Sequence, residues 1–221
     1  MFPLLIASPN ETLNYIFSMR VEILVRAVTV TLFNSLFGFT TALALVSIIA
    51  LASFFSSFFR YFTRALNKFI QSVSVLVWAI VFIMIFGVTS AYPPILVTAM
   101  ASFPILLSSM TETITNLEKE YSELSKILDL NKLQEFRHII LPGSIPYMIS
   151  ASRSALGIAL RISVVAEAFG SSGGIGYQLV YSYDLGLKVG VFAWSTILII
   201  MMLILDQLIL GPIERWSQKW R

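Results

Sequence analysis

The sequence contains no cysteine and a single histidine, His138. The lack of cysteine excludes disulfides, thiol nucleophiles and cysteine metal sites. The lone His138 lies beside Arg137 in a loop, which favours a solvated or interfacial role, so we expect no bound metal in this chain. Charged residues are also scarce, at 12% of 221 residues, which is roughly half of the 25% typical of soluble domains.

In their place the chain has long apolar runs. Hydrophobic residues make up 57% of the sequence, and the mean hydropathy is +0.83. A soluble domain of this size has no interior large enough for so much apolar surface, so the pattern indicates an all-α integral membrane protein. The net charge of +3 does not suggest a nucleic-acid partner, because the basic residues cluster beside the apolar runs, as in cytoplasmic loops.

The apolar runs predict about five transmembrane helices. A helix needs about 20 apolar residues to cross a bilayer core of about 30 Å. The uncharged stretch 69–111 is too long for one helix, and Gly87 and Pro93–Pro94 interrupt it, which favours two spans with a tight turn. The expected spans are 30–52, two within 69–111, 145–167 and 189–210.

The distribution of lysine and arginine predicts the orientation. With five spans, one face receives eleven basic residues and the other receives only Arg20, Arg26 and Lys188, with Arg161 inside a span. The face rich in basic residues is expected to be cytoplasmic. The N-terminus is then outside, the C-terminus is cytoplasmic, and residues 1–26 form an outer-face interfacial segment.

The loop 116–141 predicts a helix, a break and a second helix. Tyr121, Leu124 and Leu128 recur at helical spacing, together with Ile127, which gives the first helix one apolar face. Asn131 and Gln134 form a capping-box pattern that starts the second helix. These helices either lie in the membrane interface or form a docking surface for a cytoplasmic partner.

Several segments resemble one transporter family in the same order along the chain. They are Glu123–Leu124–Ser125 with Asp129 and Ile140–Leu141–Pro142, preceded by Phe103–Pro104–Ile105–Leu106 and followed by SRSALGIAL (152–160), AEAFGSSGGIGY (166–177) and Leu205–Asp206. Together they resemble the permeases of ATP-binding-cassette importers of the nitrate, sulfonate, taurine and bicarbonate group. The resemblance implies a type I importer permease fold, with residues 27–221 as the transmembrane permease domain and 116–141 as its cytoplasmic coupling loop.

The chain departs from the family pattern at three loop positions. Leu124 and Ser125 replace alanines, and Asp129 replaces a glycine at a sharp turn. Aspartate tolerates turn conformations better than most residues, so we expect a similar bend. The family's usual helix before the segment at Pro9 is not part of this sequence, so five spans rather than six are expected.

The resemblance also implies partners. Two copies of this chain, or one copy with a similar permease, would form the pathway in a prokaryotic inner membrane, with two ATPase subunits below it and an extracytoplasmic substrate-binding protein above. ATP and magnesium would be bound by the ATPase, and this chain would hold no cofactor and catalyse no reaction. The implied coupling residues are Tyr121, Glu123, Leu124, Ser125, Leu128 and Asp129.

The implied substrate is a small anion such as nitrate, a sulfonate or bicarbonate, and the alternative is a vitamin or vitamin precursor. Asn34, Thr41 and Glu167 are candidates for the pathway, because polar groups inside spans are costly and often functional. A packing role for these residues remains open. An integral membrane enzyme and a structural membrane subunit are the rival classes, and the scarcity of acids and histidine in the spans disfavours the enzyme.

Overall fold

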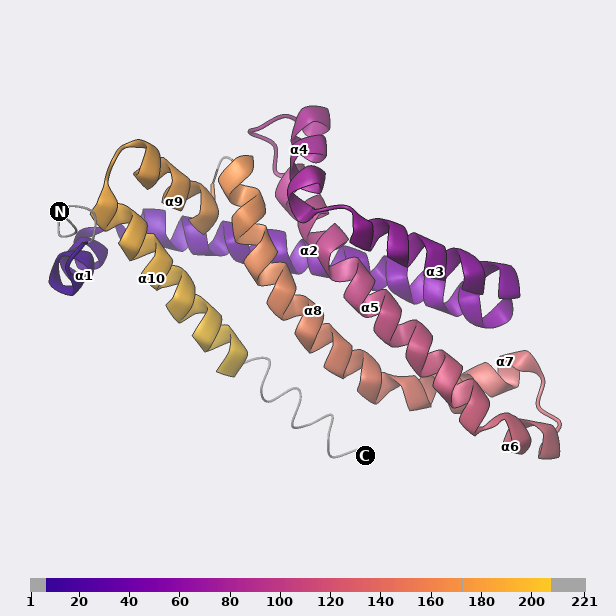
Figure 1. Ribbon diagram of the computed structural model, residues 1–221. Coiled ribbons are helices and arrows are strands. Elements are labelled where there is room, and N and C mark those ends of the chain that lie inside the picture. Colours follow the sequence, from indigo (N-terminus) through magenta and orange to yellow (C-terminus); the bar gives the residue numbers. More distant parts are fainter. Residues whose placement is uncertain (1–6, 172, 208–221) are drawn as a thin grey trace.

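The computed structural model describes residues 7–171 and 173–207, and every regular element within them is a helix (Figure 1). This confirms the expected all-α membrane fold. The elements are α1 (Pro9–Ser18), α2 (Val21–Phe55), α3 (Ser57–Ser72), α4 (Val75–Phe86), α5 (Tyr92–Glu120), α6 (Ser122–Ile127), α7 (Lys132–Glu135), a π-helical turn (Phe136–Ile140), α8 (Leu141–Phe169), α9 (Ile175–Asp184) and α10 (Lys188–Leu205).

Four helices within the described residues are long and apolar enough to cross a membrane. They are α2, α5, the continuous stretch Lys132–Phe169 that contains α8, and α10. The second expected span, the first of the two within 69–111, is broken, because α3 and α4 meet at 88°. With 12 residues, α4 is about 18 Å long and does not cross the bilayer core alone.

The break between α3 and α4 has a local cause. Val73 adopts an extended conformation, and the Ser74 side chain accepts a hydrogen bond from the Leu76 amide, which caps a new helix. The expectation of a regular second span that begins near Phe69 is therefore corrected to a bent helix pair.

The amino-terminal segment predicted to end at residue 26 ends earlier in the structure. Ser8 and Glu11 form a capping box that starts α1, with Pro9 at its first turn. The long helix α2 begins already at Val21 and has 35 residues. Residues 21–26 are therefore the first turns of α2, and only α1 is separate from it.

Small residues allow α2, α5 and α8 to pack closely in the centre of the bundle. Ala151, Ala155 and Ala159 follow one another at four-residue spacing on α8, and all three are buried. A Cβ at Gly38 of α2 would lie 2.6 Å from the Ile95 carbonyl oxygen of α5, so only glycine fits there. Such contacts between small residues are the usual way in which transmembrane helices approach each other.

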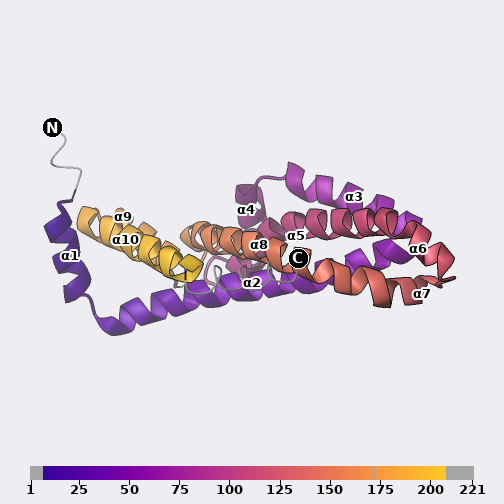
Figure 2. The same cartoon turned by 90° about the horizontal axis from the view of Figure 1, so that it is seen from below.

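The bundle has two distinct ends. The views in Figures 1 and 2 agree that α6 and α7 lie at one end, beside the start of α3 and the ends of α2 and α5, while α1 and α9 lie at the other. The candidate functional residues divide between these ends, except Thr41 in the middle of α2.

Candidate functional site

At the first end, α6 and α7 form a short projecting unit with its own internal hydrogen bonds. The Asn131 side chain accepts from the Gln134 amide at 2.9 Å, and the Gln134 side chain accepts from the Asn131 amide at 3.0 Å. The predicted capping box is confirmed. Ser125 is buried and donates to Glu135 Oε1 at 3.1 Å, which ties α6 to α7.

Asp129 makes the turn between these two helices. It is the one non-glycine residue with a positive φ among those described, at 49°. This is the left-handed conformation that favours glycine and that aspartate tolerates better than most residues. The expected bend at the position of the family's glycine is therefore present with aspartate in its place.

The unit rests on a hydrophobic cluster at the ends of the long helices. Its buried members include Phe54 of α2, Ile114 and Leu117 of α5 and Ile140 before α8. The rings of Phe54 and Phe136 lie 5.5 Å apart. The residues that flank the unit, Tyr121 before α6 and Phe136 after α7, are therefore packed against the ends of α2 and α5.

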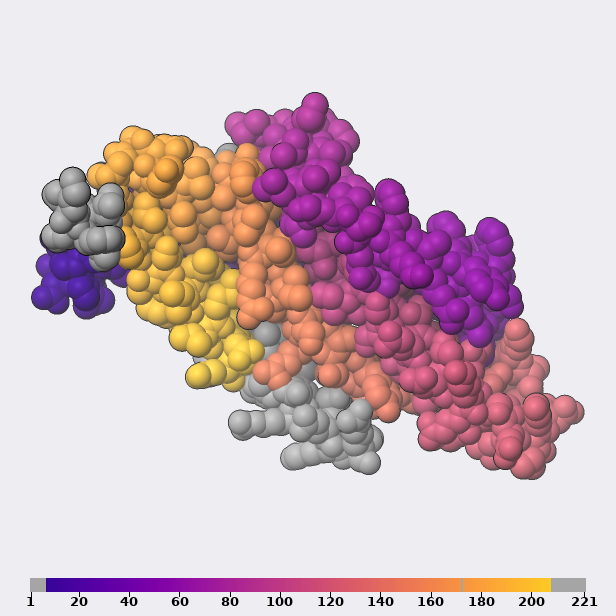
Figure 3. Space-filling model, viewed as in Figure 1, coloured from indigo at the N-terminus to yellow at the C-terminus, as the bar shows by residue number. Residues whose placement is uncertain are grey.

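Away from this cluster the unit exposes apolar side chains, which we call the apolar tip. Its members and their exposed fractions are Leu124 (43%), Ile127 (79%), Leu128 (56%) and Leu133 (65%). Figure 3 shows that α6 and α7 project beyond the rest of the bundle. Exposed apolar side chains on such a projecting unit are typical of a contact surface.

The predicted coupling residues do not all belong to the apolar tip. Tyr121 is half-buried and packs beside the hydrophobic cluster, and Ser125 is buried. Glu123 and Asp129 are exposed. Ile127 and Leu133 were not among the predicted coupling residues, although the helical recurrence that includes Ile127 was the signal that could have found it.

At the other end, Glu167 of α8 is the centre of a buried polar cluster. Its carboxyl group is reached by donors from two other helices, and the residue is only 1% exposed. The donors are Thr31 Oγ1 at 2.8 Å, Asn34 Nδ2 at 2.9 Å, Ser163 Oγ at 3.3 Å and the Gly176 amide at 3.2 Å.

Two glycines make room for this cluster. A side chain at Gly174 or Gly176 would collide with Glu167, and Gly174 also has a φ of +95°. The Gly-rich segment leads into α9, which the sequence analysis did not anticipate. The turn and α9 are held against α2 and α8 through Glu167.

The structure brings two of the three pathway candidates together and leaves the third apart. Asn34 and Glu167 are hydrogen-bonded to each other and buried within the chain. Thr41 lies two turns further along α2, is half-buried, and donates to the Phe37 carbonyl oxygen at 2.7 Å. Thr41 is not hydrogen-bonded to Glu167 or to its partners. The pathway role of all three residues stays a prediction.

A polar stripe on α5 was missed by the sequence analysis. Ser108, Glu112, Asn116 and Glu120 recur every four residues, and all four line a hollow of about 480 Å³ that also includes Tyr147 of α8. The four-residue recurrence was the available signal. Such a stripe on a helix long enough to span a membrane is expected to face protein or water rather than lipid.

Comparisons with known proteins agree with this architecture. The model of a protein family described as binding-protein-dependent transport system inner membrane component matches residues 42–211. An aliphatic sulfonates transport permease of Bacillus subtilis is 26% identical over 192 residues, which are 87% of this chain and 69% of that protein. A nitrate import permease of Synechococcus elongatus is 30% identical over 132 residues, 58% of this chain and 46% of that protein.

A solved structure supports the same fold. This chain resembles a protein chain in an inward-facing structure of the MetNI methionine ABC transporter, with a TM-score of 0.67 and 17% sequence identity. The match covers 98% of this chain and 97% of that chain. At this identity the likeness establishes the type I importer permease fold alone.

Proposed function

Since this chain belongs to the family of binding-protein-dependent transport system inner membrane components, we propose that it forms a solute pathway and couples it to ATP hydrolysis by a partner. It is a multi-pass inner-membrane permease subunit of an ABC importer. Residues 27–221 are the permease domain in this proposal, and 116–141 are its coupling loop.

The observation that carries the coupling role is the apolar tip on the α6–α7 unit. Leu124, Ile127 and Leu128 are exposed, while the same unit is anchored through Ser125 and the cluster around Phe54. Each large apolar side chain that becomes fully buried contributes about 1.5–3 kcal/mol before docking costs. A groove on an ATPase subunit would cover this surface, and movement of the groove would move α5 and α8 together.

The proposed assembly contains two permease copies, two ATPase subunits and an external substrate-binding protein. The ATPase subunits would bind ATP and magnesium, and the chain itself would supply the path. The polar stripe on α5 is the surface that we propose faces this path, because Ser108 and Glu112 would be costly against lipid. Native mass spectrometry of the purified complex is expected to find two copies of this chain.

We propose a small anion as the substrate, since the two relatives are named for aliphatic sulfonates and nitrate. The test is uptake by vesicles that contain the permease, its ATPase and its binding protein. Nitrate and a short sulfonate are compared with a pyrimidine vitamin precursor at equal concentration. ATP-dependent uptake of the vitamin precursor without uptake of either anion would overturn the substrate proposal but leave the importer role intact.

A further inference from the structure

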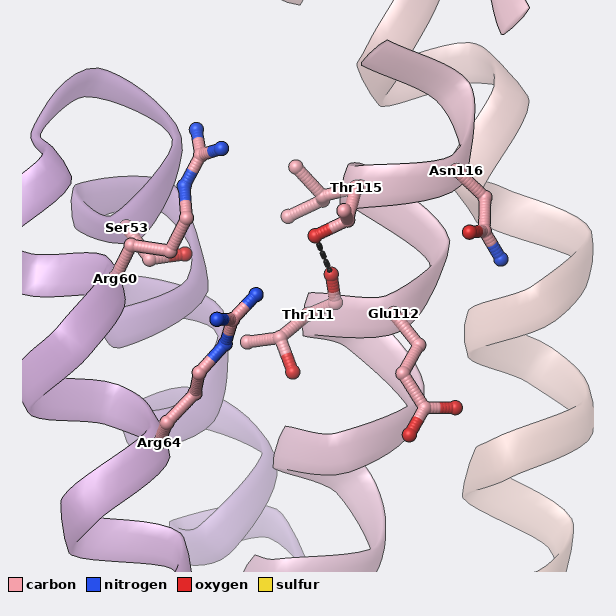
Figure 4. A pocket seen from close by; sticks show the side chains of 8 residues that line it. Ser53, Arg60, Arg64, Thr111, Glu112, Thr115 and Asn116 are labelled. Atoms are coloured by element: carbon pink, nitrogen blue, oxygen red, sulfur yellow. Dashed lines mark hydrogen bonds between the residues drawn. The ribbon is translucent and has the colours of Figure 1, made fainter. Parts of the chain in front are cut away.

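A second hollow, of about 340 Å³, lies between α3 and α5 near the end that carries α6 (Figure 4). Its lining includes Arg60 and Arg64 of α3, Thr111 and Thr115 of α5, and Ser53 near the end of α2. Figure 4 shows the two guanidinium groups and the two threonine side chains facing the same space. The volume corresponds to on the order of ten water molecules.

The two arginines retain unused hydrogen-bond capacity. Arg60 pairs with Glu118 through one nitrogen, Nη2, at 2.9 Å. Arg64 is exposed, and its side chain makes no hydrogen bond or ion pair with the part of the chain that the structure describes. A guanidinium group carries five N–H donors, so most of the ten donors here have no acceptor from the protein. The Glu112 side chain borders the hollow but forms no ion pair with either arginine among the described residues.

The surroundings of the hollow fit a membrane-interface position. Arg60, Arg64 and Lys68 recur every four residues along α3, and the same helix exposes Phe58 and Tyr61. Basic residues combined with exposed aromatic rings are typical of helices at the headgroup level. Basic pockets between helices on the cytoplasmic side attract anionic headgroups.

We propose that Arg60 and Arg64 form a binding site for a phosphate group, supplied either by an anionic phospholipid or by free phosphate. Guanidinium forks match the geometry of phosphate oxygens and bind them with two parallel hydrogen bonds. Thr111 and Thr115 now donate to carbonyl oxygens of α5, at 2.7 Å in each case. Either hydroxyl hydrogen can rotate toward a bound oxygen atom. An occupied site links α3 to α5 and thereby steadies the bent α3–α4 pair.

The test measures the thermal stability of the purified full-length chain in neutral detergent. Phosphatidylglycerol, phosphatidylcholine and inorganic phosphate are titrated separately. We expect phosphatidylglycerol to raise the midpoint temperature and phosphatidylcholine to leave it unchanged. Arg64→Gln is expected to raise the half-saturating concentration about tenfold, as for the loss of one charge-assisted hydrogen bond. Lys68→Gln removes the same charge one turn along α3, outside the hollow, and is expected to change it by less than about twofold.

The three titrations also identify the source of the phosphate group. Protection by phosphatidylglycerol alone assigns the site to a lipid headgroup, and equal Arg64-dependent protection by inorganic phosphate assigns it to a soluble ion. Equal losses in Arg64→Gln and Lys68→Gln would show a diffuse attraction to the basic helix, and the proposal would then be wrong. The proposal is also wrong if neither phosphatidylglycerol nor inorganic phosphate raises the midpoint temperature. Since neither ATP nor the ATPase is present, the result is separate from the transport function.

Discussion

Thr31 of α2 donates a hydrogen bond to Glu167 of α8 at 2.8 Å and at the same time accepts one from the Ile175 amide at 2.9 Å. One hydroxyl group thus joins α2, α8 and the first residue of α9. The two side chains are 136 residues apart in the sequence. This contact fixes the Gly-rich turn at the end of the bundle opposite to the apolar tip.

Removal of the Thr31 hydroxyl is expected to destabilise that end. Thr31→Val keeps the shape of the side chain but leaves the Ile175 amide without its acceptor and Glu167 without one donor. We expect a loss of about 1–3 kcal/mol, the usual cost of an unsatisfied buried polar group, measured as a lower midpoint of thermal unfolding in detergent. Thr29→Val is the control, because the exposed Thr29 hydroxyl contacts only the Val25 carbonyl oxygen of its own helix. Equal midpoints for the two variants would contradict the structural role of Thr31.

The turn at Asp129 leads to a prediction with a defined order of stability. Asp129→Gly should be tolerated or slightly stabilising, because glycine adopts a positive φ without a steric penalty. Asp129→Val should cost about 1–2 kcal/mol, since a β-branched residue is strained in the left-handed region. Thermal unfolding of the three proteins is expected to give the order glycine, aspartate, valine, from most to least stable. A valine variant as stable as the original chain would show that the turn relaxes to another conformation.

The apolar tip predicts a specific loss of ATPase binding. Leu124→Arg places a charge in a surface that we propose is buried by the partner, where an unpaired charge is costly. We expect pull-down of the ATPase and substrate-stimulated ATP hydrolysis to be abolished. Glu123→Ala should have a milder effect, because an exposed charge at the rim contributes little.

Leu185→Arg is the matched control for this experiment. Leu185 has a similar exposed fraction, 55% against 43% for Leu124, and it follows α9 at the opposite end. The control is expected to retain full ATPase association. Normal association and stimulation in Leu124→Arg would instead mean that α6 lies on the lipid surface, which is the alternative that the sequence left open.

The absence of cysteine makes the orientation directly testable. A single cysteine introduced at Lys126 or at Leu185 is the sole thiol in the chain, and both parent side chains are exposed. We expect a membrane-impermeant maleimide to label position 185 in intact cells and position 126 only after the membrane is opened. Labelling of position 126 from outside would reverse the proposed topology.

The sequence by itself determined the features that depend on local composition and spacing. Long apolar runs specify membrane helices because an unsatisfied peptide group is costly in lipid. The Asn131–Gln134 capping box and the turn at Asp129 involve residues within a few positions of each other, so their geometry follows from local chemistry. The family resemblance was also carried by local motifs, such as Ile140–Leu141–Pro142.

The tertiary structure decided the features that require residues far apart in the chain to meet. Glu167 was recognised from the sequence as a costly polar residue, but its hydrogen-bond partners on α2 lie more than 130 positions away. Tyr121 and Leu124 share one helical periodicity, yet only contact with the Phe54 cluster determines that the first is half-buried and the second exposed. Composition determines which side chains leave water, whereas the packing of α2, α5 and α8 determines which of them meet.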